Sequence, residues 1–341
     1  MIIDSHAHFV GGPGLHALWT ALEAAGTYGP APTITGLEDG LREGVEKQIR
    51  LMDEVGTDLQ LTSPRPFVLK HSHRPGRIVH SWARVYNDAI AYQVGQQSGR
   101  VLGVGALPQV DGAPITEVFD ELDRVVDDLG FVGVLLNPDP SEGAGTSPVL
   151  GDEYWYPLYE RLQAMDVPVL LHSAGCYGRE NYSEHFISEE SLAILSVIRA
   201  GVFRQFPGLK IVVPHGGGSI PYQIGRWMAH DRTYPEAGRE PFEESLRRFW
   251  FDTCLYTPAA IALLVETVGA DRVLFGTERP GSGAPLDDLK PVIEAIPGFS
   301  AADRSAIFAA NARTVYSRVD KLLSPAGKLL SPAGKAIGVA G

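Results

Sequence analysis

The stretch VPVLLH, residues 167–172, decides the fold, because a run of apolar residues ends there in a single polar side chain. Seven further runs have the same form: MIID (1–4), DLQLTSP (58–64), VLGVGALP (101–108), VGVLLNP (132–138), LKIVVPH (209–215), FWFDTC (249–254) and RVLFGTE (272–278). Continuous rather than alternating hydrophobicity is typical of strands buried on both faces of a parallel sheet.

Segments with helical periodicity separate these runs, at 37–55, 82–97, 115–129, 154–165, 189–206, 221–230, 258–268 and 286–295. Eight strand–helix pairs with uniform composition predict one closed (β/α)8 TIM barrel. An open doubly wound sheet is the alternative, but no glycine fingerprint follows the first strand.

The barrel is expected to fill residues 1–320 as a single catalytic domain closed by a helix at 301–318. A stretch rich in Gly, Pro and Ala, about 11–36, is expected to be a loop insertion after the first strand. The heptamer KLLSPAG occurs twice, at 321–327 and 328–334. Two copies are too few for a repeat architecture. Residues 321–341 are therefore predicted to be a flexible tail.

Composition excludes several classes of function. The net charge is −12 and no basic block occurs, which argues against nucleic acid or an anionic membrane as a partner. The two cysteines form no disulfide framework and favour a reducing compartment. Neither a signal peptide nor an apolar run of the roughly 20 residues that span a bilayer is visible. The expected location is the cytoplasm.

Polar residues follow seven of the eight apolar runs, and only the third ends without one. In a barrel, catalytic groups lie where strands end, at the carboxyl-terminal rim. The residues at these positions are His6, His8, Arg65, Asn137, His172, His215, Asp252 and Glu278.

Three histidines and a carboxylate in this set have the chemistry of a metal site. His6 and His8 are two residues apart on a strand, so both point to the same side. His172 ends the fifth run, and Glu278 ends the last strand, which neighbours the first in a closed barrel. Such ligands suit a divalent ion with water in an open position. The alternatives are surface histidines at 6 and 8 and a core histidine at 172.

Three further residues could take part in proton transfer. His215, in the segment PHGGGS, is a candidate general acid or base, and it could also be an additional ligand or a turn residue. Cys176 could be a proton donor or a small buried residue. Asp252 could orient a neighbouring histidine or cap its loop.

An anionic substrate on an acidic protein needs local positive charge. Arg65 and Arg226 are the candidates for binding substrate carboxylates, since guanidinium pairs with a carboxylate through two parallel hydrogen bonds. A structural salt bridge is the alternative for each, and Arg279 is a weaker third candidate. Asn137, which ends the fourth run, is assigned to substrate binding. The expected partner is a small carboxylate.

Four of these motifs carry a resemblance: DSHAH (4–8), the histidine that ends the fifth run, PHGGG (214–218) and FGTE (275–278). The chain resembles the amidohydrolase-related family that includes 2-amino-3-carboxymuconate-semialdehyde decarboxylase and the γ-resorcylate decarboxylases. Within it the 4-oxalomesaconate hydratase group is most similar, through LNPDP (136–140), YWYPLYE (154–160) and IVVPHGGGSIPYQIGR (211–226), in a likeness that covers residues 1 to about 320.

The resemblance implies a hydratase that adds water to the C=C bond of an unsaturated keto polycarboxylate such as 4-oxalomesaconate. It implies one divalent metal, Zn²⁺ or alternatively Mn²⁺, held by His6, His8, His172 and Glu278. Decarboxylases of the family usually carry aspartate at the end of strand eight, where this chain has glutamate. A non-oxidative decarboxylase or a metal-dependent hydrolase remains the alternative, and a homodimer is expected by analogy.

Two comparisons with the family refine this expectation. Binuclear barrel hydrolases often bridge two metals with a carboxylated lysine at the end of strand four, whereas this chain has Asn137, which favours one metal. The segments 70–80, 174–186 and the one after Glu278 differ from the hydratase pattern. Because all three are expected to line the barrel mouth, they leave the substrate open more than the metal.

Overall fold

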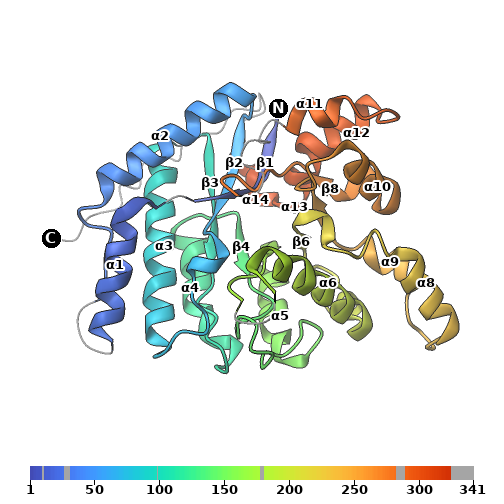
Figure 1. Cartoon of the computed structure of the whole chain (residues 1–341), viewed down its shortest axis with the longest axis horizontal. Coiled ribbons are helices and arrows are strands. Elements are labelled where there is room, and N and C mark those ends of the chain that lie inside the picture. Colours follow the sequence, from blue (N-terminus) through green and yellow to red (C-terminus); the bar gives the residue numbers. More distant parts are fainter. Residues whose placement is uncertain (10, 27–30, 98, 177–179, 282–288, 324–341) are drawn as a thin grey trace.

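Eight parallel strands form a barrel at the centre of the fold (Figure 1). The structure is a computed structural model that describes residues 1–9, 11–26, 31–97, 99–176, 180–281 and 289–323. The strands are hydrogen-bonded in sequence order: β1 (Ile3–His8), β2 (Leu59–Ser63), β3 (Val101–Ala106), β4 (Gly133–Leu136), β5 (Val169–Leu171), β6 (Ile211–Val213), β7 (Trp250–Asp252) and β8 (Val273–Leu274). The predicted (β/α)8 fold is confirmed.

The last strand meets the first, which places the ends of β8 and β1 side by side. The backbone N–H of Ser5 donates to the carbonyl of Phe275 at 2.8 Å, and that of Glu278 donates to the carbonyl of His6 at 2.7 Å. A parallel bridge joins Ala7 to residue 279. The closure therefore brings Glu278 next to the histidines of β1, as the strand order predicted.

Helices surround the strands in the described part of the chain. Their bounds are α1 (Gly12–Ala25), α2 (Glu38–Val55), α3 (Arg77–Gln96), α4 (Phe119–Asp123), α5 (Tyr156–Met165), α6 (Tyr182–Ala200), α7 (Val202–Gln205), α8 (Ile224–Thr233), α9 (Phe242–Leu246), α10 (Pro258–Val268), α11 (Leu289–Glu294), α12 (Ala301–Ser305), α13 (Asn311–Val315) and α14 (Ser317–Leu322). Short π-helical turns continue α4 and α12. Most lie within the predicted helical segments.

Several helices differ from the sequence expectation. Helix α9 lies in no predicted segment, and α3 begins five residues before the predicted 82. The expected loop insertion at 11–36 contains α1, whose Leu15 and Leu22 lie two turns apart and are buried. Figure 1 shows α1 beside α3. Helix α6 begins seven residues before the predicted Glu189, because Asn181 and Glu184 form a capping box that starts the helix there. The apolar pattern alone does not reveal this early start.

The described residues include no helix long and apolar enough to span a membrane. The predicted tail at 321–341 overlaps the last residues of α14. Residues 324–341, which contain most of both KLLSPAG heptamers, lie outside the described part of the chain. The tail therefore stays a prediction.

Two glycines of β3 make room for an aromatic ring of the core. A Cβ atom added to Gly103 would lie 2.5 Å from Cδ1 of Phe131, and one added to Gly105 would lie 3.2 Å from Cδ2 of the same ring. Phe131 is 1 % exposed, so its ring has no room to move into solvent. The glycines of VLGVGA are thus required by side-chain packing.

We predict that Gly103→Ala lowers the free energy of unfolding by about 1–3 kcal/mol, since overpacked cores lose that amount. Gly95→Ala is the matched control, because Gly95 is an exposed residue of α3 with no atom within 4 Å of an added Cβ. The control should raise the free energy of unfolding by no more than about 1 kcal/mol, because alanine favours a helix more than glycine does. Denaturant unfolding of both variants checks this, and equal stabilities would contradict the packing role.

Candidate metal centre

Three buried imidazoles meet at the carboxyl ends of β1 and β5. His6 and His8 lie on β1, and His172 directly follows β5. The ring centroids are 4.9 Å apart for His6 and His8, 5.2 Å for His6 and His172, and 5.3 Å for His8 and His172. The Nε2 atoms of His6 and His8 are 3.3 Å apart. The three imidazoles predicted to form one face are therefore close together.

A carboxylate on β7 fixes the orientation of His6. Nδ1 of His6 lies 2.6 Å from Oδ2 of Asp252, and both side chains are fully buried. The second oxygen of Asp252 accepts a hydrogen bond from the backbone N–H of Cys254 at 3.0 Å. Burial alone would raise the pKa of Asp252, but the hydrogen bond to His6, the charges of neighbouring histidines and the N–H of Cys254 together outweigh it, and the pKa is lowered. Asp252 thus both orients a histidine and caps its loop.

The other two rings are oriented in the same way. Nδ1 of His8 lies 3.1 Å from Oγ of Ser63, and Nδ1 of His172 lies 2.9 Å from the carbonyl oxygen of Ser173. Nε2 of His172 is buried and has no hydrogen-bond partner. A buried nitrogen without a partner is costly unless another group binds it. Nε2 of His6 and His8 therefore lie together, and ligand atoms of His172 lie within 4.8 Å of those of His6 and His215 in one group and of His8 and Glu278 in another.

These donors fit a divalent metal ion. Burial lowers the pKa of both His8 and His172 well below the usual value, so both rings are neutral, as ligands must be. Ligand atoms of His8, His172 and Glu278 all lie within 4.8 Å of one another. Hydrogen bonds that fix Nδ1 and leave Nε2 for the metal are the usual outer-shell arrangement of histidine ligands.

Glu278 is held by two neighbours. The hydroxyl of Tyr256 donates to Oε2 at 2.6 Å, and Nε2 of His215 lies 3.7 Å from Oε1. Burial would raise the pKa of this carboxyl, but the nearby His215 and the hydroxyl of Tyr256 outweigh burial and lower the pKa to about 2. Glu278 is therefore an ionised carboxylate next to the histidines.

His215 joins the centre from β6. Its Nδ1 lies 2.8 Å from Oε1 of Glu190, a fully buried carboxyl group of α6. Burial would lower the pKa of His215, but Glu190 and Glu278 outweigh it, so the pKa is raised well above the usual value. A ligand atom of His215 also lies within 4.8 Å of those of His6 and His172. A proton donor and an additional ligand both remain compatible with this position.

Three of the six described non-glycine residues with positive φ lie at this centre. His215, Tyr256 and Glu278 have positive φ angles of 50°, 58° and 58°. Residues other than glycine rarely adopt this left-handed region, and holding a residue in a sparsely populated backbone conformation costs on the order of 1–3 kcal/mol. Such strain is typical of functional sites, because the surrounding fold must enforce it.

Of the residues predicted to bind substrate, Arg65 lies beside this centre. It follows β2, donates to the carbonyl oxygen of Pro280 at 2.6 Å, and its charge acts on the pKa of His8. It also lines a largely apolar cavity of about 620 Å³ together with Phe9 and Tyr86. Arg65 is therefore placed to meet a carboxylate at the barrel mouth.

The structure does not bring three other predicted residues into the centre. The Asn137 amide is bonded in a turn, donating to the carbonyl of Asp139 and accepting from its N–H, both at 3.0 Å. Cys176 lines a different cavity, where its Sγ donates to the carbonyl of Glu180 at 3.3 Å. Arg226 is exposed on α8, at the periphery of the molecule (Figure 1).

Sequence reasoning missed the residues that hold the ligands and the acid. Glu190, Tyr256 and Ser63 were not singled out, although each bonds a residue that was. Ser63 could have been found, because it ends β2 next to the predicted ligands. Glu190 lies 25 residues from its partner on another element, so no local spacing marks it.

Asp252→Asn is expected to weaken metal binding about 10–100-fold, the usual effect of losing an outer-shell partner of a histidine ligand. The change keeps the side-chain shape but removes the charge opposite Nδ1 of His6. Competition against a chromophoric chelator measures the affinity. Asp128→Asn, at an exposed position, is the control and should leave the affinity unchanged. Equal affinities for the two variants would refute the orienting role.

Comparisons with known proteins agree with this geometry. A 2-keto-4-carboxy-3-hexenedioate hydratase of Sphingobium sp. strain SYK-6 is 33% identical over 96% of this chain and 99% of its own. A γ-resorcylate decarboxylase of a Polaromonas species is 31% identical over 76% of this chain and 84% of its own. The crystal structure of the 4-oxalomesaconate hydratase of Rhodopseudomonas palustris aligns with a TM-score of 0.82 at 32% identity, covering 94% of this chain and 97% of that one.

The family model Amidohydro_2, described as amidohydrolase, matches residues 3–318, which include every residue of the centre. The motifs that carried the resemblance lie where the structure assembles the ligands. The chain therefore belongs to the amidohydrolase family.

Proposed function

We propose that this protein is a metal-dependent hydro-lyase that adds water to the C=C bond of an unsaturated keto polycarboxylate. The observation that carries the proposal is the likeness to a hydratase along nearly the whole of both chains. Two features of the chain support it: the buried histidines whose ligand atoms lie close together and an ionised carboxylate at the end of β8. We place the enzyme in the cytoplasm, since its cysteines are unpaired.

His6, His8 and His172 would hold the divalent ion, with Glu278 as the fourth protein ligand or its close neighbour. When bound there, the ion lowers the pKa of a coordinated water and polarises oxygen atoms of the substrate. Three imidazoles and a carboxylate suit zinc, and manganese is the alternative because of its affinity for carboxylate oxygen.

The protein residues account for the proton movements of a hydration. One C–O and one C–H bond form as the π bond is consumed, so a proton must leave the water and another must reach carbon. Glu278 is ionised and can accept the first. His215 carries its proton next to Glu278 and can deliver the second. Glu190 holds the His215 ring in place through Nδ1.

Arg65 would bind a carboxylate of the substrate, with which a guanidinium pairs through two parallel hydrogen bonds. Its guanidinium is anchored by the carbonyl of Pro280 and lies 5.8 Å from the centroid of the Phe67 ring, which restricts its orientation. The neighbouring cavity offers room for the rest of a small acid. Arg279 lines the same cavity, and a carboxylated substrate is consistent with these arginines.

Non-oxidative decarboxylation is the second candidate, favoured by the likeness to γ-resorcylate decarboxylases. Both reactions would use the same ion and the same arginines. Glutamate rather than aspartate at the end of β8 argues for hydration, because glutamate is what the hydratase group carries at that position.

Metal-loaded protein should consume the conjugated ultraviolet absorbance of 4-oxalomesaconate and yield a product heavier by one water. The metal-free protein and His172→Ala should do neither, since both lack the ion. Mass spectrometry of the product and elemental analysis of the protein check this. Release of carbon dioxide from a carboxylated acid, with no hydration product, would replace the hydratase by the decarboxylase.

His215→Asn is expected to lower kcat about 10²–10⁴-fold, the usual contribution of a general acid or base, with metal content retained. Arg65→Met should instead act mainly on KM, because it removes binding to a carboxylate that is present before and after the reaction. Steady-state kinetics on the metal-loaded variants separate the two. Loss of metal in His215→Asn would reassign this residue as a ligand.

A further inference from the structure

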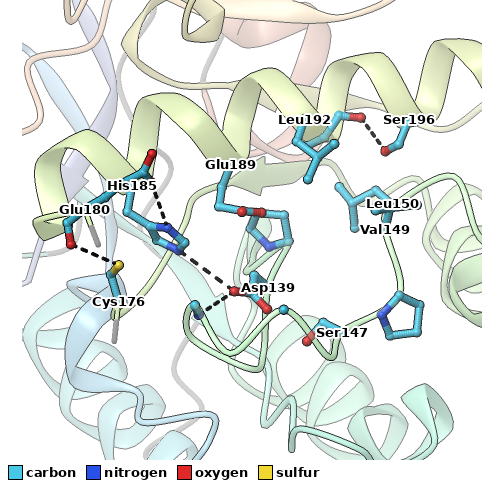
Figure 2. Close-up of a pocket in the computed structure, with 15 residues that line it drawn as sticks. Asp139, Ser147, Val149, Leu150, Cys176, Glu180, His185, Glu189, Leu192 and Ser196 are labelled. Carbon is cyan, nitrogen blue, oxygen red and sulfur yellow. Dashed lines mark hydrogen bonds and ion pairs between the residues drawn. The ribbon is translucent and has the colours of Figure 1, made fainter. Parts of the chain in front are cut away.

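A second group of metal-ligating side chains lies in a cavity beside α6, away from the histidine centre. Figure 2 shows His185 and Glu189 on the helix, facing Asp139 in the loop after β4. The cavity has a volume of about 470 Å³, and Glu180 and Cys176 also line it. None of its lining residues belongs to the centre described above.

The three side chains are arranged to share one ligand. One donor atom from each of Asp139, His185 and Glu189 lies within 4.8 Å of the others. His185 and Glu189 are four residues apart on α6, so they project from one face of the helix. The same spacing lets two residues of one helix bind a single ion.

His185 supplies the independent sign of a missing partner. Its side chain is 96 % buried, yet Nε2 makes no hydrogen bond and lies 3.9 Å from Oδ2 of Asp139. Its Nδ1 lies 3.6 Å from Oε2 of Glu180. A carboxylate opposite Nδ1 leaves Nε2 for a metal, the arrangement typical of histidine ligands.

Asp139 is held rigidly toward the same point. Its Oδ1 accepts from the backbone N–H of Ser141 at 3.0 Å and from the hydroxyl of that residue, and Oδ2 accepts from the N–H of Gly143 at 2.6 Å. These bonds fix the carboxylate in a buried turn and leave lone pairs of Oδ2 directed to the cavity.

The cavity carries uncompensated negative charge. Asp139, Glu180 and Glu189 line it, and its described lining includes no lysine or arginine. Burial raises the pKa of Glu189 to about 7, and the charges of Asp139 and Glu180 add to the shift. A bound cation would remove this repulsion and supply the partner that Nε2 of His185 lacks.

We propose that Asp139, His185 and Glu189 bind a second divalent cation, with Glu180 orienting the imidazole. One nitrogen and two carboxylates accept Mn²⁺ as well as Zn²⁺. The two sites share no ligand. They share α6, however: Phe186 packs on His172 with ring centroids 4.7 Å apart, and Glu190 bonds His215. The second cation would fix the end of the helix that carries both contacts.

The test is the Mn²⁺ stoichiometry of the full chain, stripped with chelator and reloaded by equilibrium dialysis with Mn²⁺ alone. The wild type should bind two ions per chain, and His185→Gln and Glu189→Gln one each. Glu180→Gln should keep two but weaken one of them about 10–100-fold. Glu160→Gln, which removes an exposed carboxylate from α5, is the control and should bind two.

His172→Ala separates this site from the catalytic centre. It should bind one ion, and the double variant His172→Ala/Glu189→Gln none. Circular dichroism establishes whether each variant is folded. If His185→Gln is not folded, the Glu189→Gln variant tests the site, because Glu189 is partly exposed. A wild type that saturates at one ion would overturn the proposal. So would Glu189→Gln that still binds two.

Discussion

The hydrogen bond between Asp252 and His6, 2.6 Å long and fully buried, joins β7 to β1 across the end of the barrel. It fixes the ring of His6 so that Nε2 faces the other histidines. Gly276 lies between the two residues, and a Cβ atom there would be 3.0 Å from the Cβ of each. The bond therefore needs glycine at this position as well as its two partners. Losing one partner would leave a buried polar group without its hydrogen bond, which costs about 1–3 kcal/mol.

The acid and base of the proposed reaction are coupled to this centre through one chain of contacts. Glu190, His215, Glu278 and Tyr256 alternate carboxylate with proton donor, so each buried charge has an opposite partner or a hydrogen bond. Three of the four, His215, Tyr256 and Glu278, have positive φ angles, which the folded barrel must enforce. The same residues therefore carry both the strained backbone and the charge states that the proposed reaction needs.

The positions of the candidate metal ligands were predictable from sequence because barrel geometry restricts where they can lie. A polar residue after an apolar run must be at the rim, and the closure of β8 on β1 places Glu278 beside His6. The pattern could not give side-chain direction. Asn137 directly follows β4, but its amide hydrogen-bonds within a local turn, and Arg226 is exposed on α8.

The supporting residues were beyond sequence reasoning for a different reason. The contact of Glu190 with His215 depends on how α6 packs. That helix also begins earlier than its apolar periodicity indicates. The same early turns carry His185, so the second group of ligands was invisible until the helix was in place. Strand periodicity therefore predicts the ligands of the centre, whereas helix packing determines what surrounds them.

Diffraction from crystals of the metal-loaded protein, collected at the absorption edge of the ion, tests the central claim most directly. The account predicts an anomalous peak at the ends of β1 and β5, about 2.0–2.1 Å from Nε2 of His6, His8 and His172 if the ion is zinc. A peak bound through Nδ1, or no peak among these rings in an active crystal, would contradict it.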